Sequence, residues 1–440
     1  MLLPAPPAAA SAAARSRARA GINCTIQSLF GQPTEDLIIL ATYTVCWGMT
    51  FFIIRRGSFQ LGKSKLELDF ARFTVALNVV SLFLLVTNGV QTVLYQANAM
   101  SQQSSMLAYF REGDAQFRIP QTAPQRPDIY YLILDCNAAP STLNQVWDYD
   151  NSAFIQSLQS KGFHVVPEAF SNYDRTVLSI PSSLNMQYID AIPERLGRDF
   201  NDETLNYRLI QDSRISRLLK SLGYKYINIF SGFPPTEYVP YADVNFVKSL
   251  GSAYLLEFMQ LTILSGTEKY VPLTLDVFAE TRLVPYKYAS EIAALPGPKF
   301  VLVHSLISHP PNVFNEDGHK NPLSLAVLTE NAPDRYLKQI KYTEKLVDQF
   351  VKTLLDRPGP EPIIIIQSDH GPKYRMLDDK AYYNQNMRIL LAYHFPGQKN
   401  LHRRLTPVNV FRLMLNSQSG KFANGIANTS GQVGRNLMFH

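Results

Sequence analysis

Two long apolar stretches stand near the start of the chain. Residues 37–54 form a run of 18 residues without a charged side chain, and residues 73–96 form a second uncharged run that contains Asn78, Asn88 and Gln91. A helix of 18 residues is about 27 Å long, close to the thickness of the hydrocarbon core of a bilayer. We therefore expect two transmembrane helices, at 37–54 and 73–96. The alternative is a buried helical hairpin in a soluble protein.

The charges around these stretches predict a topology. The loop between them is basic, with Arg55, Arg56, Lys63, Lys65 and Arg72. The positive-inside rule places such a loop in the cytoplasm and all that follows residue 96 on the outer face. We therefore expect a multi-pass protein of the inner (cell) membrane whose domain lies on the periplasmic or extracellular side.

One feature disagrees with this topology, because the same arrangement puts the basic N-terminal segment outside as well. That segment is rich in Ala, Pro and Arg and has no apolar core of the signal-peptide kind. We expect residues 1–36 to be disordered.

Strand and helix patterns alternate in the remainder. The polar residues 97–127 are expected to link the membrane region to a domain at 128–440. The strands are expected at 128–135, 162–166, 224–230, 299–306, 362–369 and 388–395. The helices are expected at 150–161, 204–223, 334–356 and 407–416. Continuous apolar strands between helices predict an α/β fold, with a mostly parallel sheet covered by helices on both faces.

Composition narrows the class of function. The 440 residues include 42 Lys+Arg and 36 Asp+Glu, a net charge of +6, but eight of the basic and four of the acidic residues precede residue 73. The basic excess therefore lies beside the apolar stretches, and this argues against nucleic-acid binding. Charged residues make up 18% of the chain, below the usual quarter, as expected when part of a chain lies in lipid. The three cysteines are too few for a disulfide framework or a zinc ribbon.

Two predicted strands end in an aspartate. Asp135 follows YYLIL, and Asp369 follows IIIIQS and precedes His370 and a glycine. Ligands gather at the carboxyl ends of strands in open α/β sheets, and a buried acid needs a positive partner. A divalent cation held by Asp135, Asp369 and His370 would supply it, with Mn²⁺ favoured and Zn²⁺, Mg²⁺ or Ca²⁺ as alternatives. Each aspartate could instead cap the helix that follows.

Four stretches together resemble a known family. They are SNYDRTVLSIPSSLNMQYID (171–190), HSLISHPPNVFNEDG (304–318), QSDHGP (367–372) and TPVNVFRLMLN (406–416). In this order they are similar to the membrane-anchored sulfatase-like proteins of the alkaline phosphatase superfamily, relatives of lipoteichoic acid synthase and other phosphoglycerol transferases. The resemblance runs from about residue 128 to 417, and it implies an alkaline phosphatase-like fold.

The resemblance also implies roles for single residues. Asp135, Asp369 and His370 fall on metal-binding positions, and Thr176 falls on that of a metal-bound nucleophile at the start of a helix. His309 lies where a histidine contacts the transferred group. Without the family, Thr176 would be an ordinary helix cap.

Three further residues are candidates for binding substrate: His304, Arg175 and Lys373. A hydrogen-bonded core histidine and two solvated loop cations are the alternatives.

The chain departs from the family pattern after the first acid. Relatives read Asp-Gly at this position, and here Cys136 follows Asp135. The residues 136–140 lack the arginine of the C-x-P/A-x-R frame of formylglycine sulfatases, so we interpret Cys136 as a small buried cysteine. No second Asp/His/His set is evident, which favours one metal ion.

These observations predict a metal-dependent enzyme that transfers or hydrolyses a phosphoester, such as a phosphoglycerol-type group. Its substrate would be a membrane lipid or an envelope glycan. A sulfuric ester hydrolase and a catalytically degenerate envelope-binding protein are the alternatives.

Overall fold

The computed structural model describes residues 70–112, 114, 126–197, 200, 202–248, 272–321, 333–373, 385–397 and 401–419. The chain divides into two compact units, Met1–Met100 and Ser101–His440. The expected disordered segment 1–36 and the first expected transmembrane helix, 37–54, lie outside the described residues.

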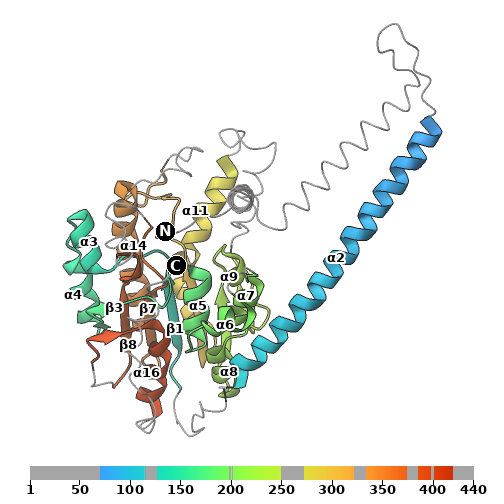
Figure 1. Cartoon of the computed structure of the whole chain (residues 1–440). Coiled ribbons are helices and arrows are strands. Elements are labelled where there is room, and N and C mark those ends of the chain that lie inside the picture. Colours follow the sequence, from blue (N-terminus) through green and yellow to red (C-terminus); the bar gives the residue numbers. More distant parts are fainter. Residues whose placement is uncertain are drawn as a thin grey trace, which may run out of the picture. The chain divides into compact units, whose positions relative to one another are not determined.

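A seven-stranded sheet forms the centre of the second unit (Figure 1). In spatial order its strands are β2 (His164–Val165), β8 (Leu391–His394), β7 (Ile363–Ser368), β1 (Ile129–Leu134), β6 (Lys299–Ser305), β4 (Lys225–Ile229) and β5 (Val244–Phe246). The strands from β7 to β5 pair in parallel, whereas β8 runs antiparallel to both of its neighbours. The expected mostly parallel sheet is therefore confirmed. A separate parallel pair joins β3 (Glu168–Ala169) to β9 (Arg404–Leu405).

The central strand β1 is buried on both faces, which explains its unbroken apolar sequence. Tyr131 belongs to one core cluster, which includes side chains of α5 (Thr176–Leu184), α8 (Arg214–Ser221) and α16 (Pro407–Ser419). Leu132 belongs to another. Successive side chains of a strand point to opposite faces, so each face of the sheet has its own apolar core.

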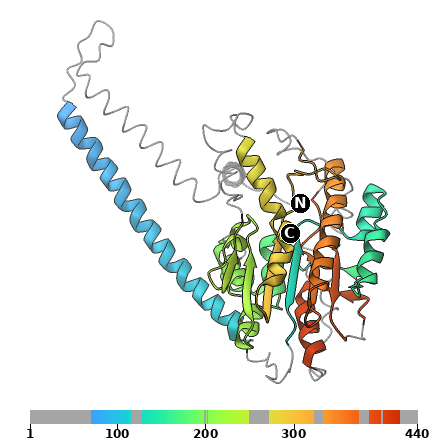
Figure 2. The same cartoon turned by 180° about the vertical axis from the view of Figure 1, so that it is seen from behind.

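The second cluster lies beneath a different set of helices. These are α4 (Ser152–Ser160), α11 (Pro272–Lys287), α12 (Ala289–Ala294) and α14 (Pro333–Leu355). Figures 1 and 2, seen from opposite sides, show the sheet between α5 and α16 on one side and α11 and α14 on the other. The predicted three-layer α/β arrangement is thus the observed one. The remaining short helices are α3 (Pro140–Trp147), α6 (Ala191–Leu196), α7 (Thr204–Gln211) and α9 (Pro234–Glu237).

The single helix expected at 204–223 is wrong, because two helices occupy this stretch. Helix α7 ends at Gln211 and α8 begins at Arg214. Ser213 between them has an extended backbone, and its hydroxyl accepts a hydrogen bond from the backbone N–H of Ser216. A serine that caps a helix in this way interrupts an otherwise continuous apolar pattern.

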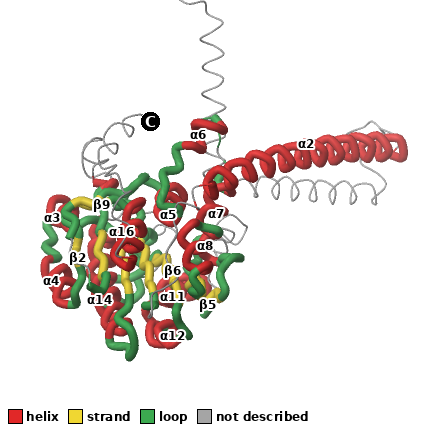
Figure 3. Tube along the Cα trace, turned by 90° about the horizontal axis from the view of Figure 1, so that it is seen from below, coloured by secondary structure: helices red, strands yellow, loops and turns green. Residues whose placement is uncertain are grey.

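The long helix α2 (Phe70–Glu112) contains the second expected transmembrane segment. Its window Leu77–Leu94 is the one stretch within the described residues that is long and apolar enough to cross a membrane, and none of it is buried. The first half of the expected linker is also helical. Met106 and Phe110, in the part of α2 that belongs to the second unit, share an apolar cluster with Leu205 of α7. Figure 3 shows this end of α2 beside α7.

We expect the replacement of a buried leucine at the centre of β1 to destabilise the fold strongly. Leu132 is 0% exposed, so Leu132→Ala should destabilise the second unit by about 2–5 kcal/mol. The same substitution at Leu401, which is 64% exposed, should have almost no effect. Thermal unfolding of the detergent-solubilised full chain measures both, and equal melting temperatures would contradict the assigned core.

Candidate active site

Parallel register brings the two strand-end aspartates together. Leu134, the last residue of β1, pairs with Ser368 of β7 on one side and with Ser305 of β6 on the other. The residues that follow, Asp135 and Asp369, therefore emerge side by side at the carboxyl edge of the sheet. They are 1% and 0% exposed.

These two carboxylates are only partly satisfied. Asp369 Oδ1 accepts hydrogen bonds from the backbone N–H groups of Cys136 (3.2 Å) and His370 (2.8 Å). Asp135 Oδ1 and Asp369 Oδ2, in contrast, accept no hydrogen bond of normal geometry from the residues that the structure describes. Buried carboxylate oxygens without partners are costly, and this makes them candidates for a cation.

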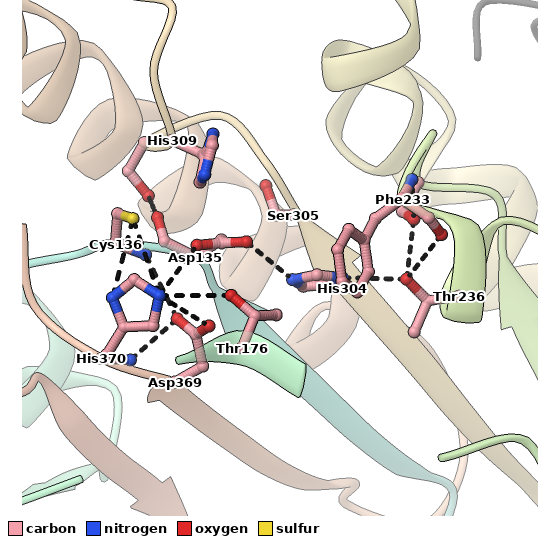
Figure 4. A network of polar contacts seen from close by, with 12 residues as sticks. Asp135, Cys136, Thr176, Phe233, Thr236, His304, Ser305, His309, Asp369 and His370 are labelled. Atoms are coloured by element: carbon pink, nitrogen blue, oxygen red, sulfur yellow. Dashed lines mark hydrogen bonds and ion pairs between the residues drawn. The ribbon is translucent and has the colours of Figure 1, made fainter. Parts of the chain in front are cut away.

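The imidazole of His370 faces the same point (Figure 4). Its Nε2 atom lies 3.5 Å from Asp369 Oδ2, 3.9 Å from Asp135 Oδ1 and 3.2 Å from Thr176 Oγ1. Its Nδ1 atom lies 2.7 Å from the carbonyl oxygen of Gly371, which assigns the proton to Nδ1. The lone pair of Nε2 is then directed at the carboxylates, as in metal-ligating histidines.

Gly371 completes this segment for a steric reason. A Cβ atom added here would lie 2.8 Å from the carbonyl oxygen of Gln385 and 2.9 Å from that of Asn386. Only glycine lets the chain after His370 pass so close to this backbone. The glycine of the Asp-His-Gly sequence is therefore explained by this close backbone approach.

Thr176 is the first residue of α5, and Arg175 before it has an extended backbone and no side-chain capping bond. The free N–H groups and the positive dipole end of a helix begin at this residue, and they favour a bound anion. Ser171 and Ser179 both donate hydroxyl hydrogen bonds to the carbonyl oxygen of Asp369, Ser179 over 2.7 Å. These two bonds hold the start of α5 against the aspartate, so they position the Thr176 hydroxyl.

The last of the four sequence stretches has a supporting role. Asn172 accepts a hydrogen bond from the backbone N–H of Val408 (3.3 Å), in the first turn of α16, and donates to the Ser182 hydroxyl (2.7 Å). The asparagine thereby ties α16 to α5.

His304 is joined to Asp135 instead of facing open space. Its Nε2 atom lies 3.3 Å from Asp135 Oδ2, an ion-pair distance, and its Nδ1 atom lies 2.8 Å from Thr236 Oγ1 (Figure 4). It comes from β6, the strand next to β1. Since Nδ1 is bonded to Thr236 and Nε2 faces Asp135, His304 is better suited to orient Asp135 than to bind substrate, the role for which the sequence made it a candidate.

His309 lies in the loop after β6, and a buried arginine holds that loop. Arg282 of α11 is 2% exposed and donates hydrogen bonds to the carbonyl oxygens of His309 (2.5 Å) and Pro311 (2.8 Å). Ser308 donates to the carbonyl oxygen of Asp135 (2.7 Å), which fixes the loop beside the carboxylates. Sequence reasoning missed Arg282, because a single arginine in a helix carries no motif.

The charges of the centre are strongly coupled. Burial alone would raise the pKa of the Asp135 carboxyl, but His309, His304 and His370 together hold that pKa below its usual range. Burial and the charge of Asp135 raise the pKa of Asp369. Burial also lowers the pKa of His309, against the opposing effect of Asp135. The centre therefore disfavours two free carboxylate charges unless a cation joins them.

Two other candidates stand apart from this cluster. Arg175 is exposed and pairs with Glu203 at 2.8 Å. The Lys373 side chain is also exposed. Substrate binding by Arg175 and Lys373 stays a prediction.

Cys136, interpreted from the sequence as a plain buried cysteine, belongs to the cluster. Its Sγ atom lies 3.7 Å from Nδ1 and 4.0 Å from Nε2 of His370. Its φ of 60° is left-handed, a conformation that costs a non-glycine residue about 1–2 kcal/mol. Burial, with Asp135 and Asp369, raises the pKa of the thiol. The sequence signal was the departure at Cys136 from the Asp-Gly pattern that the resemblance implies.

The donor set fits a divalent cation. Asp135, Cys136 and His370 each bring one donor atom within 4.8 Å of the others, and the unbonded oxygen of Asp369 lies beside them. The Thr176 hydroxyl adjoins the same imidazole nitrogen. The oxygen and imidazole donors around this point suit one ion of the Mn²⁺, Zn²⁺ or Mg²⁺ kind, and the Cys136 sulfur adjoins them.

Comparison with known proteins identifies the family of this chain. The model of the family described as Sulfatase matches residues 147–414, more than half of the chain. Asp135 and Cys136 precede the matched residues. No curated protein matches significantly.

Among solved structures, the C-terminal periplasmic domain of EptC from Escherichia coli, in complex with Zn, shares 11% identity with a TM-score of 0.43 and covers 69% of this chain and 84% of that chain. The lipoteichoic acid synthase LtaP from Listeria monocytogenes shares 12% identity with a TM-score of 0.44. The match covers 71% of this chain and 78% of LtaP. The soluble domain of lipooligosaccharide phosphoethanolamine transferase A from Neisseria meningitidis shares 10% identity with a TM-score of 0.43. This match covers 68% of this chain and 90% of that domain.

We expect His304 to act on the metal site through Asp135. Loss of such a partner typically weakens metal binding about 10–100-fold, so His304→Ala should lower the affinity for Mn²⁺ by this factor. His304→Gln, which keeps a hydrogen-bond donor, should restore part of it. Isothermal titration of the full chain in detergent measures the affinity, with the exposed His319→Ala as the matched control. Unchanged binding in His304→Ala would remove His304 from the site.

Proposed function

Because the chain belongs to the sulfatase family of the alkaline phosphatase superfamily, we propose that it is a metal-dependent enzyme that transfers or hydrolyses a phosphoester on an envelope lipid or glycan, with Thr176 as nucleophile. One observation carries this proposal. The Thr176 hydroxyl, at the open start of α5, lies 3.2 Å from His370 Nε2, beside two buried carboxylates with unbonded oxygens.

Asp135, Asp369, His370 and the Thr176 oxygen would hold the metal ion. A bound divalent ion would favour the alkoxide of Thr176 and polarise the ester. The hydroxyl proton of Thr176 leaves to water. The alkoxide would then attack phosphorus in line: the bond between the Thr176 oxygen and phosphorus forms, the bond to the leaving oxygen breaks, and that oxygen takes a proton from water and departs as the alcohol. The N–H groups at the start of α5 contact the phosphate oxygens as this happens.

The second half of the reaction needs a base, and His309 is suited to it. Its Nδ1 atom bonds the carbonyl of Pro310, so the proton is assigned there and the Nε2 lone pair is free. Burial lowers the pKa of His309, and this favours the neutral ring that a base requires. The acceptor alcohol or water gives its proton to Nε2 and bonds to phosphorus, and the Thr176 oxygen leaves as alkoxide.

The nature of residue 176 favours a phosphoester over a sulfate ester. Sulfatases of the formylglycine type oxidise a cysteine or serine in a C-x-P/A-x-R frame. A threonine cannot give formylglycine, and the cysteine of this cluster, Cys136, lies outside such a frame. A threonine that attacks directly and leaves unchanged suits phosphoryl transfer.

The apolar helix α2 favours a substrate in the membrane. None of its window Leu77–Leu94 is buried, and exposed apolar stretches of this kind mark contact with lipid or protein. A site tethered close to a bilayer meets lipid-borne substrate at high effective concentration. The basic loop before α2 supports an outward-facing site in a multi-pass protein.

Removal of the nucleophile tests the reaction. Thr176→Ala should reduce Mn²⁺-dependent cleavage of a chromogenic phosphodiester by roughly 10³-fold or more, because no other described hydroxyl adjoins His370 Nε2 in the same way. Thr353→Ala is the matched control, since the Thr353 hydroxyl bonds the Gln349 carbonyl in its own helix.

Initial rates of the full chain in detergent give the comparison. If the chain releases sulfate from an aryl sulfate and Thr176→Ala loses this activity, the substrate is a sulfate ester and not a phosphoester. Absence of turnover with both ester classes would favour a binding protein over an enzyme.

Fractionation tests the anchor. The full chain expressed in bacterial cells should sediment with membranes, resist extraction by alkaline carbonate and dissolve in detergent. Protease added to spheroplasts should digest the second unit if that unit lies outside. Release by carbonate would exclude a spanning helix, and protection in intact spheroplasts would reverse the topology.

A further inference from the structure

Cys136 lies two residues beyond the end of β1, beside the residues proposed to hold the metal ion. Its side chain is 3% exposed, and its Sγ atom lies 4.0 Å from His370 Nε2. A second, independent observation marks the same space, because Asp135 Oδ1 is buried and accepts no hydrogen bond of normal geometry from the described residues. Asp135, Cys136 and His370 thus bring an oxygen, a sulfur and a nitrogen atom around one buried point.

The spacing of these donors is close to that around zinc. In a tetrahedral site with Zn–S near 2.3 Å and Zn–N near 2.0–2.1 Å, sulfur and nitrogen are about 3.6 Å apart. The distance from Cys136 Sγ to His370 Nε2 is 4.0 Å, and that from His370 Nε2 to Asp369 Oδ2 is 3.5 Å. Small side-chain rotations bring sulfur, nitrogen and oxygen to one ion.

The backbone holds the thiol in this place. Tyr336 of α14 donates its hydroxyl hydrogen to the carbonyl oxygen of Cys136 (2.8 Å) and accepts the N–H of Ala138 (3.0 Å). The Cys136 N–H donates to Asp369 Oδ1 (3.2 Å). The left-handed turn is therefore fixed from both sides, with its side chain directed at His370.

We propose that Cys136 is a thiolate ligand of the metal ion and makes the centre selective for zinc over manganese and magnesium. The inference rests on the metal site of the proposed function and adds one ligand to it. When the ion binds, the thiol proton passes to solvent and a sulfur–metal bond forms. Thiolate is a soft donor and favours Zn²⁺. Mn²⁺ and Mg²⁺ are instead suited by carboxylate and water oxygens.

The experiment uses the full chain in detergent with Cys24 and Cys46 changed to serine, so that Cys136 is the only thiol. This protein is loaded with Zn²⁺ alone or with Mn²⁺ alone. Three variants are made in it: Cys136→Gly, Cys136→Ser and Asp369→Asn. Glycine suits the left-handed backbone at this position, so Cys136→Gly should retain the fold, and its melting temperature checks this.

X-ray absorption of the zinc-loaded protein should show a sulfur shell near 2.3 Å in addition to nitrogen and oxygen near 2.0–2.1 Å. Cys136→Gly and Cys136→Ser should lose the sulfur shell. Their affinity for Zn²⁺ should fall by at least about tenfold, while the affinity for Mn²⁺ stays within a factor of about two. Asp369→Asn should weaken the binding of both ions.

The other outcomes separate this inference from the proposed function. One bound zinc with nitrogen and oxygen neighbours alone, unchanged in Cys136→Gly, overturns the thiolate ligand and leaves the metal-dependent reaction standing. Equal loss of Zn²⁺ and Mn²⁺ affinity in Cys136→Gly overturns the selectivity. Failure of the parent protein to bind either ion overturns the metal centre itself, and the thiolate ligand with it.

Discussion

The structure depends on the compensation of two negative charges that the sheet buries at one point. Parallel register carries Asp135 and Asp369 to the same edge, where water does not reach their inner oxygens. The neighbouring groups are arranged around these two carboxylates. The imidazoles of His304 and His370 face them, and a backbone N–H group bonds Asp369 Oδ1. A serine hydroxyl of α5 bonds the carbonyl oxygen of Asp369 and holds the helix in place. A hydroxyl next to such a charge is useful for chemistry only when a cation is shared among them.

Much of the fold could be predicted from local pattern. Apolar runs such as IYYLIL and IIIIQS are strands because a strand covered on both faces needs no polar positions. The meeting of Asp135, Asp369 and His370 could also be predicted, since the ends of parallel strands share an edge. The break between α7 and α8 was not, because the apolar spacing continues through Ser213, and the capping bond becomes visible only in three dimensions.

The parts of the site that sequence reasoning missed act through backbone geometry and distant partners. Cys136 looked like a small core residue, and only its left-handed backbone directs it at His370. Arg282 bonds carbonyl oxygens of a loop 27 residues away, which no local pattern encodes. His304 became a partner of Asp135 because adjacent strands β1 and β6 are in register, so its role follows from pairing rather than from its own neighbours in the chain.

The bond from the Cys136 N–H to Asp369 Oδ1 joins residues 233 positions apart. Contacts of such separation form late, since the cost in chain entropy is met only after the intervening strands and helices have collapsed. During synthesis Asp135 is present long before Asp369, and a nascent chain that ends before residue 369 also lacks β8, the strand that joins β2 to β7. The two aspartates of the candidate site therefore come together only after most of the second unit has been synthesised and has folded.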